Sequence, residues 1–189
     1  MKKQLLTLLG IIFTLASFAQ KKQKDTAKVA FPIKDGQVFY ETIIDSLDGQ
    51  SKDHVFNTSL KWMAETFIDS KEVIQTKDKE SGSIIGTGNF TFTTSGFINT
   101  TGTMGFMIEI TARENKSRIR LYKFINKYMP SYSIETQLIP MEPAYIKYLN
   151  QKQFPKENRT YYLALKDNIE SIIKSYKQYL TVNSKKDDF

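Results

Sequence analysis

The stretch of sequence that decides the fold is residues 103–126, TMGFMIEITARENKSRIRLYKFIN. Both halves are rich in β-branched and aromatic residues, which favour strands. Asn115 lies between the halves, and asparagine readily takes the positive φ that a two-residue hairpin loop requires. We therefore predict an antiparallel hairpin of strands 103–113 and 117–126, with Asn115-Lys116 as its loop.

The register of this hairpin predicts which side chains share the core face of the sheet. Alternate residues of a strand point to the same face, so each predicted pair places both of its members on one side. The core pairs are Ala112 opposite Ile119, Ile110 opposite Leu121, and Phe106 opposite Ile125. Lys123, opposite Ile108, is the exception on this face, and we expect it to reach the sheet margin along its aliphatic stem.

The other face of the hairpin carries the candidate binding site. Its predicted pairs are Arg113 opposite Arg118, Thr111 opposite Arg120, Glu109 opposite Tyr122, and Met107 opposite Phe124. Three of the chain's four arginines thus gather on one face, although like charges placed directly opposite cost a few tenths of a kcal/mol. Such a cluster is typical of a fork for a carboxylate, a phosphate or a sulfated sugar, with Tyr122 and Phe124 as a stacking floor.

A solvated polar face is the alternative interpretation of the same residues. In that arrangement Arg120 pairs diagonally with Glu109, and the other charges keep the sheet from pairing with another chain. The candidate site therefore consists of Arg113, Arg118, Arg120, Tyr122, Glu109 and Phe124.

The rest of the chain predicts two helices and three further strands around this hairpin. The strands are expected at 37–44, 72–78 and 83–93. Ser51 is a good N-cap for a helix whose apolar face is Phe56, Leu60, Met63 and Phe67, with Trp62 off that face, covering a sheet edge or exposed. An apolar stripe from Tyr162 to Leu180 predicts the closing helix, after a connection at 138–160 with a short helix begun by Pro143.

This order of elements predicts an α+β fold. About five antiparallel strands follow one another as strand, helix, four strands and helix, with both helices on one face of a curved sheet.

Three glycines lie in the stretch GSIIGTGNF at residues 82–90. A phosphate-binding Walker loop has four residues between its glycines and then a lysine, whereas Gly82 and Gly86 have three between them and Thr87 follows. We interpret Gly82 as a turn residue with positive φ. Gly86 and Gly88 share a face with the apolar residues of their strand, so we expect a crossing helix to pack closely on them.

Several stretches resemble one bacterial family. They are FPIKDGQVFYETII, KWMAETF and KEVIQTKDKESGSIIGTGNF, and the likeness spans roughly residues 31–126. The family is an uncharacterised exported domain of unknown function whose fold is similar to that of the TATA-box-binding protein (TBP). The resemblance implies a curved antiparallel sheet with two helices on its convex face. It implies no activity and no catalytic residue, and a likeness of fold does not imply DNA binding.

The N-terminus predicts export. Lys2 and Lys3 precede an apolar run that is too short to span a bilayer, and small residues end at Ala19, the expected cleavage site. We predict a signal peptide at 1–19, a flexible leader at 20–30, one domain at 31–182 and a disordered tail at 183–189. The mature chain, without a transmembrane segment, is expected in the periplasm or outside the cell.

The composition excludes several kinds of functional site. The chain has no cysteine and one histidine, His54, which excludes disulfides and thiolate sites and leaves no basis for a histidine-based metal site. We expect no metal and no cofactor. The net charge of +7 arises from scattered lysines, which favour solubility and weak attraction to anionic surfaces rather than nucleic-acid binding.

The leading functional hypothesis is a non-enzymatic envelope module. On this hypothesis it binds an envelope protein, a glycan or a small anion on the open face of its sheet. One alternative is a small hydrolase that uses carboxylates, drawn from Glu41, Asp45, Asp78, Glu80 and Glu109. The other is a structural or assembly role through exposed sheet edges.

Overall fold

The computed structural model of the protein describes residues 27–67, 73–94, 100–129, 134–153 and 156–183. The chain divides into two units, residues 1–30 and residues 31–189, and each is described by itself. In the first unit, residues 27–30 form neither helix nor strand. The predicted signal peptide lies outside the described residues, as do residues 20–26 of the leader and 184–189 of the tail.

The second unit is built on one antiparallel sheet of seven strands. The strands are β1 (Ile33–Lys34), β2 (Gln37–Ile44), β3 (Ile74–Asp78), β4 (Ser83–Thr94), β5 (Thr100–Arg113), β6 (Lys116–Tyr128) and β7 (Gln137–Pro140). Their order across the sheet is β1-β2-β6-β5-β4-β3, and β7 also pairs with β6. The sheet exceeds the predicted five strands because β1 and β7, which are only two and four residues long, carry little sequence signal of their own.

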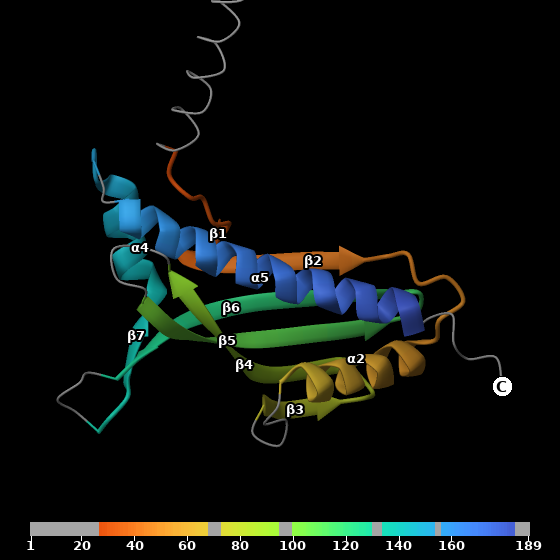
Figure 1. The fold of residues 1–189 in the computed structure, drawn as a ribbon. Coiled ribbons are helices and arrows are strands. Elements are labelled where there is room, and N and C mark those ends of the chain that lie inside the picture. Colours follow the sequence, from red (N-terminus) through yellow and green to blue (C-terminus); the bar gives the residue numbers. More distant parts are fainter. Residues whose placement is uncertain (1–26, 68–72, 95–99, 130–133, 154–155, 184–189) are drawn as a thin grey trace, which may run out of the picture. The chain divides into compact units, whose positions relative to one another are not determined.

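Helices cover one face of this sheet. They are α2 (Lys52–Thr66), α4 (Met141–Asn150) and α5 (Lys156–Asn183). Figure 1 shows α2 and α5 side by side along the same face, which confirms the predicted α+β arrangement. Helix α4 contacts β6 and begins at Met141, two residues before its predicted start at Pro143. Helix α5 continues through Asn183, the first residue of the predicted tail.

The described helices include none that is both long enough and apolar enough to cross a membrane.

Helix α2 begins as predicted but buries a wider face. The Oγ of Ser51 accepts a hydrogen bond from the backbone N–H of His54 at 3.1 Å, which satisfies one donor of the first turn. Trp62 is 1% exposed, and its ring centroid lies 4.7 Å from that of Tyr176 on α5. The expectation of an edge or exposed position for Trp62 is therefore wrong, because α2 packs against α5 as well as against the sheet.

A buried hydrogen-bond network joins α2, α5 and the sheet. The hydroxyl of Tyr176 lies 2.7 Å from the Oγ of Ser59 on α2 and 2.6 Å from the Oγ of Ser117 on β6. Burial raises the pKa of Tyr176 to about 12, so its hydroxyl keeps its proton at neutral pH. These contacts fix α5 against both α2 and the sheet, and they leave none of the three hydroxyls without a partner.

The glycines of β4 allow the close packing that the sequence predicts. Gly82 has a φ of +73°, as expected for a turn residue. A Cβ added at Gly86 would collide with the carbonyl oxygen of Val73 and lie 2.9 Å from the Cε of Met63 on α2. A Cβ at Gly88 would collide with the ring of Phe106. At these two glycines, the backbone of Val73 and the side chains of Met63, Phe67 and Phe106 therefore occupy the space that a side chain would need.

The β5–β6 hairpin turns one residue earlier than predicted. Arg113 pairs with Lys116, so the loop is Glu114-Asn115 rather than Asn115-Lys116, and Asn115 has the positive φ of +59°. Contacts with the start of α2 hold this turn. The N–H of Asn115 donates to the carbonyl of Gln50 at 2.9 Å, and Glu114 accepts from the N–H of Lys52 at 3.1 Å.

The register shift changes every predicted pair but leaves residues 117–122 on their expected alternating faces. Residues 107–113 of β5 each meet a partner two positions earlier in β6 than predicted, and two is the period of a strand. Arg118 therefore faces Thr111, and Arg120 faces Glu109. The predicted opposition of Arg113 and Arg118 is wrong.

A β-bulge then reverses the faces near the end of β6. The pairs Met107–Tyr122 and Gly105–Ile125 leave one residue between them on β5 and two on β6. Lys123 is the extra residue of the bulge, and its φ is +52°. Phe124 is consequently 0% exposed in the core, and Lys123 is exposed. The predictions that Phe124 lies on the open face and that Lys123 and Ile125 lie on the core face are wrong.

Candidate functional site

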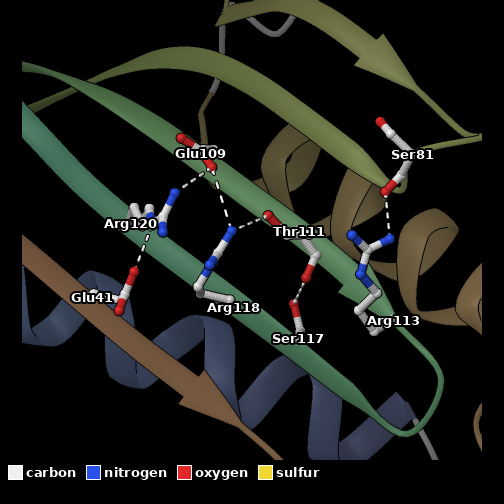
Figure 2. A network of polar contacts seen from close by, with 8 residues as sticks. All are labelled: Glu41, Ser81, Glu109, Thr111, Arg113, Ser117, Arg118 and Arg120. Carbon is white, nitrogen blue, oxygen red and sulfur yellow. Dashed lines mark hydrogen bonds and ion pairs between the residues drawn. The ribbon is translucent and has the colours of Figure 1, made fainter.

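The open face of the sheet, opposite α2 and α5, carries a row of alternating charges. Glu41 on β2, Arg120 on β6 and Glu109 on β5 are direct cross-strand neighbours. The Nε of Arg120 donates to the Oε2 of Glu41 at 2.6 Å, and its Nη1 donates to the Oε1 of Glu109 at 2.9 Å (Figure 2). The charge of Arg120 is therefore compensated by two carboxylates.

This bonding stabilises the charged forms of Glu41 and Arg120. The hydrogen bond from Arg120 holds the pKa of Glu41 below its ordinary value, and the bond to Glu41 raises the pKa of Arg120. Glu109 belongs to the predicted site, but it lies directly opposite Arg120 rather than diagonally. Arg120 therefore fits the predicted alternative of a charge-paired face better than an anion fork.

A hollow lies beside this row, toward the β5–β6 turn. Its volume is about 270 Å³, and its lining residues, which we call the anion pocket, are Ile43, Thr111, Arg113, Lys116, Ser117 and Arg118. Three of the six are cations and none is an acid. The volume lies just below the range of roughly 300–1,000 Å³ typical of drug-sized ligands, so it suits one small anionic group.

Arg118 is the most constrained cation of the anion pocket. Its Nη2 donates to the Oγ1 of Thr111 at 3.2 Å and lies 3.8 Å from the Oε1 of Glu109 (Figure 2). Its Nε is buried and meets no acceptor within the described part of the chain. A buried donor without an acceptor is costly, and an oxyanion bound beside this guanidinium would supply one.

Arg113 and Lys116 add two exposed cations at the turn. They face each other across the two strands, where like charges are unfavourable. The Nη1 of Arg113 donates to the backbone carbonyl of Ser81 at 2.8 Å, which orients the guanidinium beside the β3–β4 turn (Figure 2). An arginine has five N–H donors, so this bond leaves others for a ligand. The sequence prediction did not include Lys116.

Comparison with known protein families supports the α+β fold described above. Residues 39–126 match the domain of unknown function (DUF4468) with TBP-like fold. This range contains all of β3, β4 and β5 and most of β2 and β6. The chain carries a DUF4468 domain. The resemblance to a domain of unknown function with a TBP-like fold is thereby confirmed. No curated protein sequence matches the chain.

Two crystal structures share the fold of this chain. A TBP-like protein from Parabacteroides distasonis is 16% identical, with a TM-score of 0.64, over 79% of this chain and 96% of its own. A DUF4468 family protein from Bacteroides ovatus is 19% identical, with a TM-score of 0.64, over 79% of this chain and 90% of its own. At these identities the likeness concerns the fold alone.

An aromatic pair lies on the far side of the charged row from the anion pocket. The rings of Phe39 on β2 and Tyr122 on β6 stack with centroids 5.9 Å apart. The Nζ of Lys34 lies 4.9 Å from the centroid of Phe39. Tyr122 therefore has an aromatic neighbour as predicted. That neighbour is not Phe124 but Phe39, from a strand that is adjacent in the sheet and distant in sequence.

The six predicted site residues thus separate into four environments. Arg113 and Arg118 line the anion pocket, Arg120 and Glu109 form the charged row, Tyr122 belongs to the aromatic pair, and Phe124 is in the core. The sequence prediction missed Ile43 and Phe39, and it treated Glu41 only as a possible catalytic acid. All three depend on the pairing of β2 with β6, for which the chain carries no local signal.

The acids and the histidine considered for catalysis are mostly dispersed in the DUF4468 domain. Asp78 accepts from the backbone N–H groups of Glu80 and Ser81, so it shapes the β3–β4 turn. The Nε2 of His54 lies 3.3 Å from the Oγ1 of Thr58 one helical turn away. Among the described residues, no group of three or more acids, histidines or cysteines is arranged to hold a metal ion.

Proposed function

We propose that this DUF4468 protein is a non-enzymatic module of the cell envelope that binds an anionic group in the anion pocket. The observation that carries the proposal is the concentration of Arg113, Lys116 and Arg118 around a hollow of about 270 Å³, with the Nε of Arg118 buried and without an acceptor among the residues that the structure describes. Guanidinium groups are well matched to carboxylate, phosphate and sulfate oxygens.

The proposed ligand carries its anionic group on a glycan, a small molecule or the surface of an envelope protein. Ile43 is 59% exposed and supplies an apolar wall to the pocket, so the group next to the anion would be apolar in part. Export through the signal peptide predicted at residues 1–19 would bring the domain to such ligands.

The charges on the open face favour binding over carboxylate catalysis. Glu41 and Glu109 are the two considered acids that meet, and they do so through Arg120. A hydrolase of this kind needs one acid that stays protonated near neutral pH, which requires a raised pKa. The pKa of Glu41 is instead lowered, so this carboxyl is poorly suited to donate a proton.

A glycan array tests the proposal and separates the possible ligands. The array displays sulfated, phosphorylated, carboxylated and neutral glycans, and is probed with the wild type, Arg118→Ala and Lys116→Ala. We expect the wild type to bind one anionic class and both variants to lose that binding without loss of thermal stability. Lys77→Ala removes an exposed charge from β3 and serves as the matched control, with binding retained.

Arg120→Ala is expected to lower stability while leaving glycan binding largely intact, because Arg120 bonds to Glu41 and Glu109 instead of lining the pocket. Equal loss of binding in the Lys77→Ala control would show that net charge alone is responsible, and the proposed pocket would then be rejected.

A further inference from the structure

A second hollow lies where α4, the start of α5 and the end of β6 meet. Its volume is about 420 Å³, within the range of roughly 300–1,000 Å³ typical of ligand sites. The residues that matter most in its lining are Asn126, Tyr148, Gln151, Asn158, Tyr161 and Tyr162, and we call it the tyrosine pocket. It shares no lining residue with the anion pocket.

The lining of the tyrosine pocket is largely aromatic, includes three amide side chains and is almost uncharged. Asn126, Gln151 and Asn158 come from three different elements, and each amide offers both donors and an acceptor. Lys147 is the one charged residue among those that line the hollow. Burial raises the pKa of Tyr161 and of Tyr162, so both phenols keep their protons and remain neutral.

Aromatic rings in mutual contact form one wall of the pocket. The ring centroids of Tyr148 and Tyr162 lie 4.5 Å apart, and those of Tyr161 and Tyr162 lie 5.1 Å apart. Tyr161 also meets Phe92 on β4 edge to face at 5.2 Å. These contacts hold the rings in place before any ligand arrives, which lowers the entropy lost on binding.

The pocket lining includes a buried polar atom that has no partner in the described part of the chain. The Oε1 of Gln151, the C-cap residue of α4, is buried and meets no donor within the described residues. Buried acceptors are nearly always satisfied by protein, water or ligand. A hydroxyl group in the hollow would provide the missing donor.

We propose that the tyrosine pocket binds a neutral saccharide. Sugar hydroxyls both donate and accept hydrogen bonds, which matches the three amides, and the apolar C–H face of a sugar ring packs on aromatic rings. A lining without carboxylates and with one lysine gives no strong preference for a charged ligand. This inference stands apart from the anion pocket, so either site can fail without the other.

Titration of the full-length ¹⁵N-labelled protein with cellobiose and with N,N′-diacetylchitobiose tests the inference by NMR. We expect saturable shifts of the side-chain amide signals of Asn126, Gln151 and Asn158 with at least one of these disaccharides. Asn158→Ala and Asn126→Ala should each weaken binding about five-fold, the effect of losing one hydrogen bond. Asn57→Ala, at an exposed position on α2, is the control and should bind as the wild type does.

Three results would overturn the inference. The first is the absence of saturable shifts with both disaccharides. The second is unchanged binding in both Asn126→Ala and Asn158→Ala when circular dichroism shows that the variants are folded. The third is tighter binding of glucuronate than of glucose, which would assign the pocket to an acidic ligand through Lys147.

Discussion

Glu41 and Arg120 form an ion pair across β2 and β6, with 2.6 Å between the Oε2 of the carboxylate and the Nε of the guanidinium. The two residues are 79 positions apart in the chain. Glu109, on the other side of Arg120, makes the group a triad across three strands. The triad therefore links β2, which precedes α2 in the chain, to the β5–β6 hairpin.

The stability of the protein should depend on the charge of Glu41. Its folded pKa is below the ordinary value of 4.5, so the ion pair stabilises the fold above that pH and is lost as the pH falls through the folded pKa. We expect Glu41→Gln to have a lower Tm than the wild type at pH 6 to 7, and the two Tm values to converge as the pH approaches 3. A difference in Tm that stays constant from pH 3 to 7 would contradict this role.

Tyr176→Phe should destabilise the protein by about 1–3 kcal/mol, because it removes the hydroxyl that bridges two buried serines. Urea denaturation followed by circular dichroism measures this change. Tyr128→Phe removes a hydroxyl from a residue that is 49% exposed, and we expect a change within about 0.5 kcal/mol. Equal effects of the two substitutions would show that the bridge contributes nothing.

Gly86→Ala should lower the free energy of unfolding by about 1–3 kcal/mol, because the added methyl would collide with the backbone carbonyl of Val73 and crowd Met63 of α2. The matched control is Gly105→Ala on the neighbouring strand. There the nearest atom is the flexible end of Lys127 at 3.0 Å, which can move aside. Chemical denaturation of both variants checks the comparison, and a Gly86→Ala protein as stable as Gly105→Ala would contradict this crowding at Gly86.

The sequence predicted the class of fold because its signals were local and strong. Ser51 marks the start of α2, Gly82 marks a turn, and the apolar stripe of α5 has helical period over many residues. The glycines of β4 also indicated close packing correctly, since only a nearby element explains two glycines on the buried face of a strand.

The details of the site depended on contacts that are distant in sequence. Asn115 tolerates positive φ at either position of the turn, and the choice is made by the bonds of the turn to Gln50 and Lys52. The bulge at Lys123 contains no glycine that would indicate it in the sequence. It nevertheless places Phe124 in the core and not on the open face. Errors in the predicted site therefore came from tertiary anchoring and not from the residue types.

Export is tested by the mass of the native protein. We expect the chain isolated from its own cells to begin at Gln20, because Ala19 ends the predicted signal peptide. Intact-mass spectrometry of the envelope and culture-medium fractions checks this prediction. A native protein that retains residues 1–19 and occurs in the cytoplasm would contradict both the export and the proposed envelope role.

The anion pocket is tested most directly by NMR titration of the ¹⁵N-labelled protein with sodium sulfate at constant ionic strength. We predict saturable shifts confined to the backbone amides of residues 111–118 and Ile43. Arg118→Ala should weaken binding about tenfold or more, the effect of losing a charge-assisted hydrogen bond. Shifts that do not saturate, that spread over lysines throughout the chain, or that persist unchanged in Arg118→Ala would contradict the proposed site.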